Sequence, residues 1–173
     1  MQNNISFSSE HSLGEDLLFL NQAIVAAKNI QLVDGVYYHY HRREDSCDAK
    51  TLSEEKIKSA LDVYEKIVDN TNSSILVVDP MYNFVCHNFI MSCFYLSLKS
   101  EDVKIKNICA QKTADIFEKC RDIDGLEKSF AKTAPHVFLS LKNKNIQEVE
   151  NVMIKCKTIM EIIIFGLRAR IKK

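Results

Sequence analysis

The chain has 173 residues, of which 46% are hydrophobic and 27% charged, and these proportions exclude a disordered protein. Its 23 basic and 23 acidic residues give a formal net charge of zero, so no overall field attracts a nucleic acid. No apolar run approaches the roughly 20 residues that span a bilayer, and the N-terminal residues lack the charged and apolar stretches of a signal peptide.

The six cysteines are scattered along the chain, and no two of them form a Cys-x-x-Cys pair. This distribution favours buried thiols in a reducing compartment over disulfides or a zinc site. We therefore expect a cytoplasmic protein and assign no metal ligands.

The first 40 residues predict a strand, a helix and a β-hairpin, in that order. Ile5 to Ser9 alternates apolar and polar residues, which indicates a short strand. From Glu15 to Asn29, apolar residues recur at helical spacing, and Asp16 lies in the first turn of that helix. Gln31 to Tyr40 is typical of two extended pieces joined by a turn at Asp34-Gly35.

After residue 50 the sequence predicts helix almost throughout. Helices are expected from Ser53 as N-cap, from Asp79-Pro80, over Glu101 to Arg121, over Gly125 to Lys142 with a break at Pro135, and over Ile146 to Leu167. Four or five amphipathic helices with short connections predict a compact bundle. The predicted fold is therefore mainly α, with a short α/β segment at residues 1–50 and a helical bundle domain at residues 51–173.

A series of short motifs runs through the first of these regions. It comprises Gly14-Glu15-Asp16-Leu17-Leu18-Phe19-Leu20, Ala26-Ala27-Lys28-Asn29-Ile30, Val33-Asp34, Tyr38-His39-Tyr40 and Ser46. In order and spacing, these motifs resemble the C-terminal end of the catalytic domain of family 2 glycosyltransferases, over about residues 5–50.

The resemblance implies the end of a GT-A domain, an α/β fold that moves a sugar from a nucleotide-sugar donor to an acceptor hydroxyl with inversion. It implies that Asp16 is the base that deprotonates the acceptor and that Glu15 orients the acceptor or Asp16. It further implies bacterial surface polysaccharide or glycan synthesis, and a divalent metal (Mg or Mn) in the full-length enzyme. Two acids in a first helical turn also have an alternative role, since they stabilise the helix terminus.

Basic side chains follow at the end of the predicted hairpin. His39 and His41 are two residues apart, so both rings face the same side of a strand, as a metal or a diphosphate site requires. His41 stands where the family commonly has Arg. We therefore expect His39, His41, Arg42 and Arg43 to bind substrate, with a solvated polar strand end as the alternative.

The sequence has no strand-rich nucleotide-binding segment and no Asp-x-Asp element before Ile5. We therefore expect this chain to be the C-terminal fragment of a longer enzyme and to be inactive alone. A segment cut from an α/β domain exposes apolar faces, so we also expect a homo-oligomer in which Ile5 to Tyr40 is covered. The alternative is a non-catalytic helical module that binds a protein partner.

The C-terminal residues suggest one more interaction. Ile162-Ile163-Ile164-Phe165 is followed by Arg168, Arg170 and two lysines, a pattern that suits the surface of an anionic membrane. The same pattern suits a core helix whose basic C-terminus complements the helix dipole.

Overall fold

A computed structural model of the chain describes residues 5–11, 13–31, 33–35, 52–73, 79–121, 123–131 and 134–156. Within these ranges the chain forms seven α-helices and no strand, so the mainly α fold is confirmed. The helices are α1 (Glu15–Ala26), α2 (Glu54–Ser73), α3 (Asp79–Ser97), α4 (Val103–Glu118), α5 (Ile123–Phe130), α6 (Pro135–Lys142) and α7 (Ile146–Lys155).

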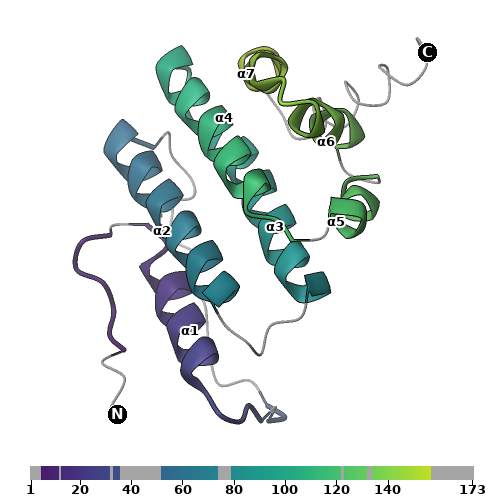
Figure 1. The fold of residues 1–173 in the computed structure, drawn as a ribbon. Coiled ribbons are helices and arrows are strands. Elements are labelled where there is room, and N and C mark those ends of the chain that lie inside the picture. The colour runs from purple at the N-terminus through teal and green to yellow at the C-terminus, as the bar shows by residue number, and fades with distance from the viewer. Residues whose placement is uncertain are drawn as a thin grey trace.

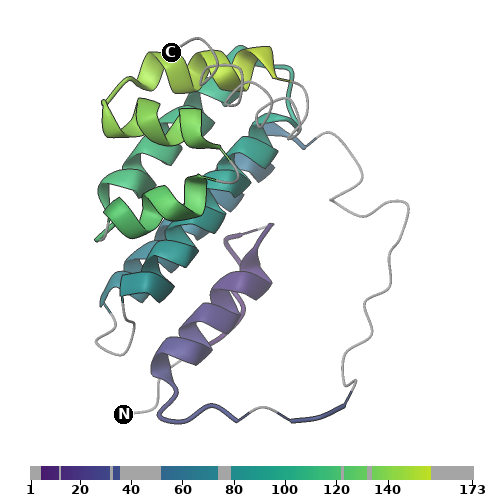
Figure 2. The ribbon, with the colours of Figure 1, turned by 90° about the vertical axis from the view of Figure 1, so that its right-hand side faces the viewer.

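The helices lie in three groups. In Figure 1, α1 and α2 lie on one side, α3 and α4 in the middle, and α5, α6 and α7 on the other side. The contacts follow the same order, because α2 packs on α1, α3 and α4, while α3 packs on α5 and α4 on α7. Figure 2 shows α1 separated from the α5, α6 and α7 group.

Local sequence signals explain where several helices begin. The Ser53 Oγ accepts a hydrogen bond from the Lys56 N–H at 3.3 Å, and the Asp102 side chain caps α4 through the Lys104 N–H at 2.8 Å. Each cap satisfies an amide that the helix leaves without a partner. Pro135 opens α6 in its first turn, so the predicted break between two short helices is confirmed.

The main core lies around α3 and α4. The largest side chains with almost no exposure are aromatic: Tyr82, Phe94, Phe130 and Phe138. The Tyr82 hydroxyl donates to the Lys119 carbonyl oxygen at 3.0 Å, which satisfies its polar end. The free thiols of Cys86, Cys93, Cys109 and Cys156 are also buried, as expected for core thiols, whereas Cys120 is partly exposed.

The predicted strand at Ile5 to Ser9 is wrong, because these residues have no regular secondary structure. Alternating residues need a neighbouring strand to pair their backbone groups, and no strand lies within the described ranges. Instead, the Phe7 ring stacks on Phe19 with 4.3 Å between the ring centroids. The start of the predicted hairpin, Gln31 and Val33 to Gly35, is also not strand, and residues 36–51 lie outside the described residues.

Helix α7 is shorter than its apolar pattern predicts. It ends at Lys155, and Cys156 has an extended backbone with φ −83° and ψ 136°. The apolar spacing continues beyond Cys156, so spacing alone does not mark the end of this helix. The rest of the predicted helix and the basic C-terminal residues lie outside the described residues.

Candidate functional site

Gly14 forms the turn that opens α1 and places Glu15 and Asp16. It is the N-cap residue, with φ +86° in the left-handed region that favours glycine. The Leu18 N–H donates to the Gly14 carbonyl oxygen at 3.0 Å, which closes the first turn of the helix. A Cβ atom at Gly14 would lie 3.2 Å from Cγ1 of Val63 on α2. Both the backbone angle and the close approach to α2 therefore require glycine here.

One side of α2 holds α1 in place. Leu18 is buried in a small cluster with Val63 and Ile67 of α2. One turn further along α1, the Asn21 side-chain amide donates to the Thr71 hydroxyl at 3.0 Å. Apolar contacts and a side-chain hydrogen bond thus fix the position of α1 along α2.

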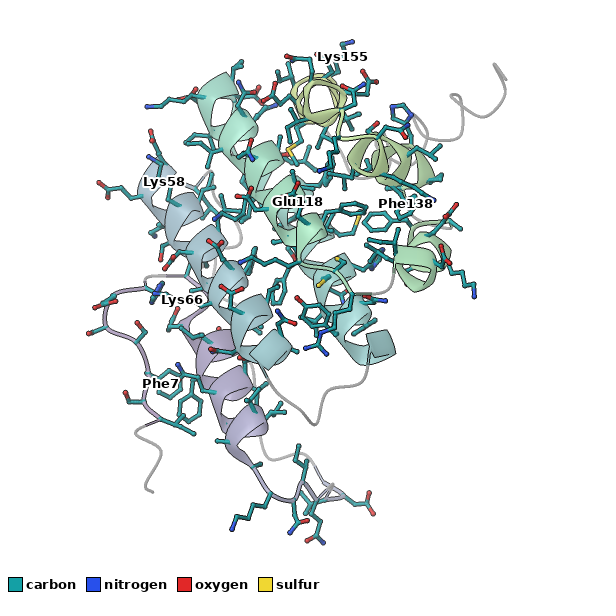
Figure 3. The ribbon with its side chains drawn as sticks, viewed as in Figure 1. Phe7, Lys58, Lys66, Glu118, Phe138 and Lys155 are labelled. Carbon is teal, nitrogen blue, oxygen red and sulfur yellow. The ribbon has the colours of Figure 1, made fainter. Side chains whose placement is uncertain are left out.

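A second set of contacts holds the residues just before the turn. The His11 ring is almost fully buried, with Nδ1 2.6 Å from Ser8 Oγ and Nε2 2.8 Å from Asp62 Oδ2. Lys66 Nζ lies 2.9 Å from the same Asp62 oxygen, between α2 and the N-terminal segment in Figure 3. Lys66 Nζ also lies 3.1 Å from His11 Nε2. Among the tautomers of His11, the one with a proton on Nε2 lets His11 and Lys66 both donate to Asp62, while the Ser8 hydroxyl donates to Nδ1.

The charges of this cluster stabilise one another. The hydrogen bond from His11, followed by the hydrogen bond from Lys66, holds the pKa of Asp62 below its usual 3.8. A buried histidine that bridges two parts of the chain also fixes their relative position. The cluster of Ser8, His11, Asp62 and Lys66, which we call the His11 clamp, therefore ties the N-terminal segment to α2.

The order serine, histidine and aspartate is also used by hydrolases to activate a serine. Here, however, Ser8 Oγ accepts the Glu10 N–H at 3.2 Å and so closes a local turn. The cleft described below between α4, α6 and α7 contains none of the four clamp residues. This geometry supports a clamp better than a nucleophile.

The two acids of the turn differ in exposure. Glu15 is partly buried, whereas Asp16 is exposed, and its Oδ1 accepts the Leu17 N–H at 2.8 Å. The second carboxylate oxygen of Asp16 has lone pairs that can accept a proton from a hydroxyl group. The Asp16 carboxylate is thus accessible from the solvent.

An apolar surface lies beside this turn. Leu17, Leu20 and Ile24 recur at helical spacing on α1 and are 46%, 53% and 41% exposed. Phe7, Ile30 and Val33 are exposed as well, and Figure 3 shows Phe7 beside α1. We call the exposed side chains of Leu17, Leu20 and Ile24 the α1 apolar face. Exposed apolar patches of this kind mark interaction surfaces.

The predicted site residues fall into two groups. Glu15 and Asp16 lie together in the first turn of α1, as predicted. His39, His41, Arg42 and Arg43 lie outside the described residues. Sequence reasoning missed the contact between His11 and Asp62, because 51 positions separate the two residues. The only local signal was the spacing of Asp62 and Lys66, which suits a pair on one helix face.

The described residues contain neither a metal-binding group nor a membrane-spanning helix. Within the described ranges, no group of three or more His, Cys, Asp or Glu side chains is placed to hold a metal ion. Likewise, none of the helices in the described part of the chain has the length and hydrophobicity that a bilayer crossing requires.

The sequence was compared with known proteins in three ways. No protein-family model matches it, and neither a curated protein nor a solved structure shows significant similarity to it.

Proposed function

We propose that this chain is the acceptor-side end of an inverting family 2 glycosyltransferase. The observation that carries the proposal is the Gly-Glu-Asp turn itself. Gly14 is the N-cap of α1 in a left-handed conformation, α1 starts directly at Glu15, and the Asp16 carboxylate is exposed in the first turn. The resemblance of residues 5–50 to the family supplies the chemical role.

In this proposal Asp16 is the general base. The acceptor hydroxyl donates a hydrogen bond to Asp16 and passes its proton to the carboxylate as its oxygen attacks the anomeric carbon of the donor. The nucleotide diphosphate leaves from the opposite face, so the configuration inverts. Glu15, which is less exposed, orients the acceptor or Asp16.

The donor site is proposed to lie in another part of the enzyme. No group of three or more metal-ligating side chains lies within the described residues, and we place the Mg or Mn that would neutralise the leaving diphosphate in the donor-binding part. His39, His41, Arg42 and Arg43 are proposed to contact the phosphates or the acceptor. The proposed setting is synthesis of a bacterial surface polysaccharide or glycan in the cytoplasm, at the inner face of the membrane.

Helix α2 has a defined role in the proposal. It contacts the turn through Val63, it contacts Leu18 through Val63 and Ile67, and it holds His11 through Asp62. A base must lie within hydrogen-bond distance of the proton that it removes, so its position has to be fixed. We infer that the helical bundle supports the acceptor-side turn.

The α1 apolar face supports the same proposal. Leu17, Leu20 and Ile24 are exposed on a helix that packs on α2. We propose that the remaining part of the α/β catalytic domain covers this face in the active enzyme. In the chain alone, a second copy takes that place and forms a homo-oligomer.

The test is a sugar-transfer assay of the full-length enzyme, in which a donor-binding half precedes this chain. Asp16→Asn is expected to lower kcat at least about 100-fold, as loss of a general base does. Glu15→Gln is expected to have a smaller effect, mainly on KM for the acceptor. Transfer at a normal rate by Asp16→Asn would show that Asp16 is not the base.

A second candidate function is a non-catalytic module that binds a protein partner. The α1 apolar face favours it, because exposed leucines suit a protein interface. The coding sequence upstream of Met1 separates the two candidates. About 200 in-frame residues with a nucleotide-binding pattern, roughly one domain, support the enzyme. A stop codon close to Met1 supports the module.

A further inference from the structure

A cleft of about 680 Å³ lies between α4, the start of α5, the end of α6 and the start of α7. Volumes of this size are typical of small-molecule sites in proteins. Its apolar lining includes Phe117 of α4, Ile123 of α5, Leu141 of α6 and Ile146 of α7. The cleft is separate from the Gly14 turn, so an inference about it does not depend on the proposed function.

The turn between α6 and α7 shapes one side of the cleft. The Asn145 N–H donates to the Ser140 carbonyl oxygen at 2.8 Å, and the Lys144 N–H donates to the Leu141 carbonyl oxygen at 2.9 Å. This pair of bonds is the Schellman pattern, which needs a left-handed residue where Lys144 has φ +54°. Glycine is usual at that position, because a side chain disfavours the left-handed conformation. Lys144 adopts it nevertheless.

The polar lining is weakly paired. Its four polar residues are Gln111, Glu118, Lys142 and Lys144, and the two lysines are its cationic groups. Lys144 Nζ is 3.7 Å from Glu118, and both side chains are more than two-thirds exposed. Lys142 Nζ is 3.3 Å from Glu127, and both are about half exposed. Exposed pairs contribute little to stability, so both ammonium groups are available to a ligand.

We propose that this cleft binds an amphipathic anion, a single apolar chain or ring that carries one carboxylate. The carboxylate binds to the cationic part of the lining, where Lys142 and Lys144 both belong to the cleft and supply ammonium groups that donate hydrogen bonds to anions. The apolar part covers Phe117, Ile123 and Leu141 and leaves water. Figure 3 labels Glu118 on α4 and Phe138 on α6, two of the four helices around the cleft.

The probe is decanoate, titrated into the full chain below its micelle concentration and followed by isothermal calorimetry. We expect a single site with a Kd of about 0.1–1 mM, the range for a ligand of this size with ordinary efficiency. Decyltrimethylammonium has the same chain and the opposite charge, and it should bind at least about tenfold more weakly, because it meets two lysines.

Two variants test the residues. Lys142→Gln with Lys144→Gln should weaken decanoate binding about tenfold, since both cationic donors are lost. Lys58→Gln with Lys155→Gln is the matched control, because it removes the same charge from partly or fully exposed lysines outside the cleft lining. The control should leave the Kd unchanged.

A third variant allows binding to be followed by fluorescence, independently of calorimetry. The chain has no tryptophan, and Gln111 is exposed at the cleft, so Gln111→Trp introduces a single reporter without disturbing the core. Its emission should change with decanoate concentration and give the calorimetric Kd. Equal binding of decanoate and decyltrimethylammonium, an unchanged Kd in the Lys142 and Lys144 variant, or no response of the tryptophan would overturn the proposal.

Discussion

Helices α1 and α3 are both rich in apolar residues, yet only α3 is built into the core. Helix α3 buries Tyr82, Cys86, Ile90, Cys93, Phe94 and Leu96, whereas α1 buries Leu18 alone and exposes Leu17, Leu20 and Ile24. The reason is the number of neighbours, because α3 packs on α2, α4 and α5, and α1 packs on α2. An apolar helix with one covered face has a second face that suits a partner.

The largest expected loss of stability comes from truncating a buried side chain of α3, and the matching change in α1 should cost much less. Phe94→Ala in α3 should lower the free energy of unfolding by about 3–5 kcal/mol, because it leaves a cavity at a fully buried position. Leu20→Ala in α1 should change the stability of the monomer by less than about 0.5 kcal/mol, because that side chain is exposed in the single chain. Urea denaturation measures both, and equal losses would contradict the comparison.

Gly14 tests how α1 is attached to α2. Gly14→Ala should destabilise α1 by about 1–3 kcal/mol, through its positive φ and the contact with Val63. Hydrogen exchange should therefore speed up in α1 more than in α3. Gly125→Ala is the matched control in helix α5, where alanine should instead gain up to about 1 kcal/mol. Losses of the same sign at both positions would show that the left-handed turn is not the cause.

The pH dependence tests the ionic contacts that surround α2. Hydrogen bonds from His11 and Lys66 hold the pKa of Asp62 below its usual 3.8, and a hydrogen bond from Lys112 is the main reason that the pKa of Glu65 lies below its usual 4.5. Carboxylates with lowered pKa values add stability above their usual pKa, and this stability is lost as the pH falls. The melting temperature should therefore drop between about pH 5 and pH 3.

A single variant assigns this acid loss to the His11 clamp. Asp62→Asn removes one of the two carboxylates, so its melting temperature should fall less steeply over the same pH range. An identical slope in the variant and the original chain would mean that Asp62 contributes nothing to the pH dependence. Glu65 would then account for it through Lys112 and Lys119, which lie 2.5 Å and 3.1 Å away.

A small change in the stability of the monomer is expected for substitutions in the α1 apolar face. Leu17→Gln with Leu20→Gln should alter the free energy of unfolding by less than about 1 kcal/mol, because both side chains are exposed. The same variant should convert a homo-oligomer of the chain to a monomer in light scattering. If the original chain is a monomer in light scattering, the proposal that it self-associates through the α1 apolar face is wrong.

The sequence predicted those parts of the fold that depend on local signals. Ser53 as N-cap, the break at Pro135 and the start of α1 after Gly14 all follow from residues adjacent in the chain. The strand at Ile5 to Ser9 was wrong because pairing depends on a distant neighbour. The link from His11 to Asp62 was missed for the same reason, since nothing near His11 specifies its partner.

We propose that Asp16 acts as a base and does not merely stabilise a helix terminus. Asp124 provides the comparison, because it also lies in the first turn of a helix, α5, and outside the Gly14 turn. Asp16→Asn and Asp124→Asn should have similar small effects on melting temperature. In a sugar-transfer assay of the enzyme that contains this chain, only Asp16→Asn should lower kcat, by at least about 100-fold. Equal transfer rates for the two variants would contradict the account.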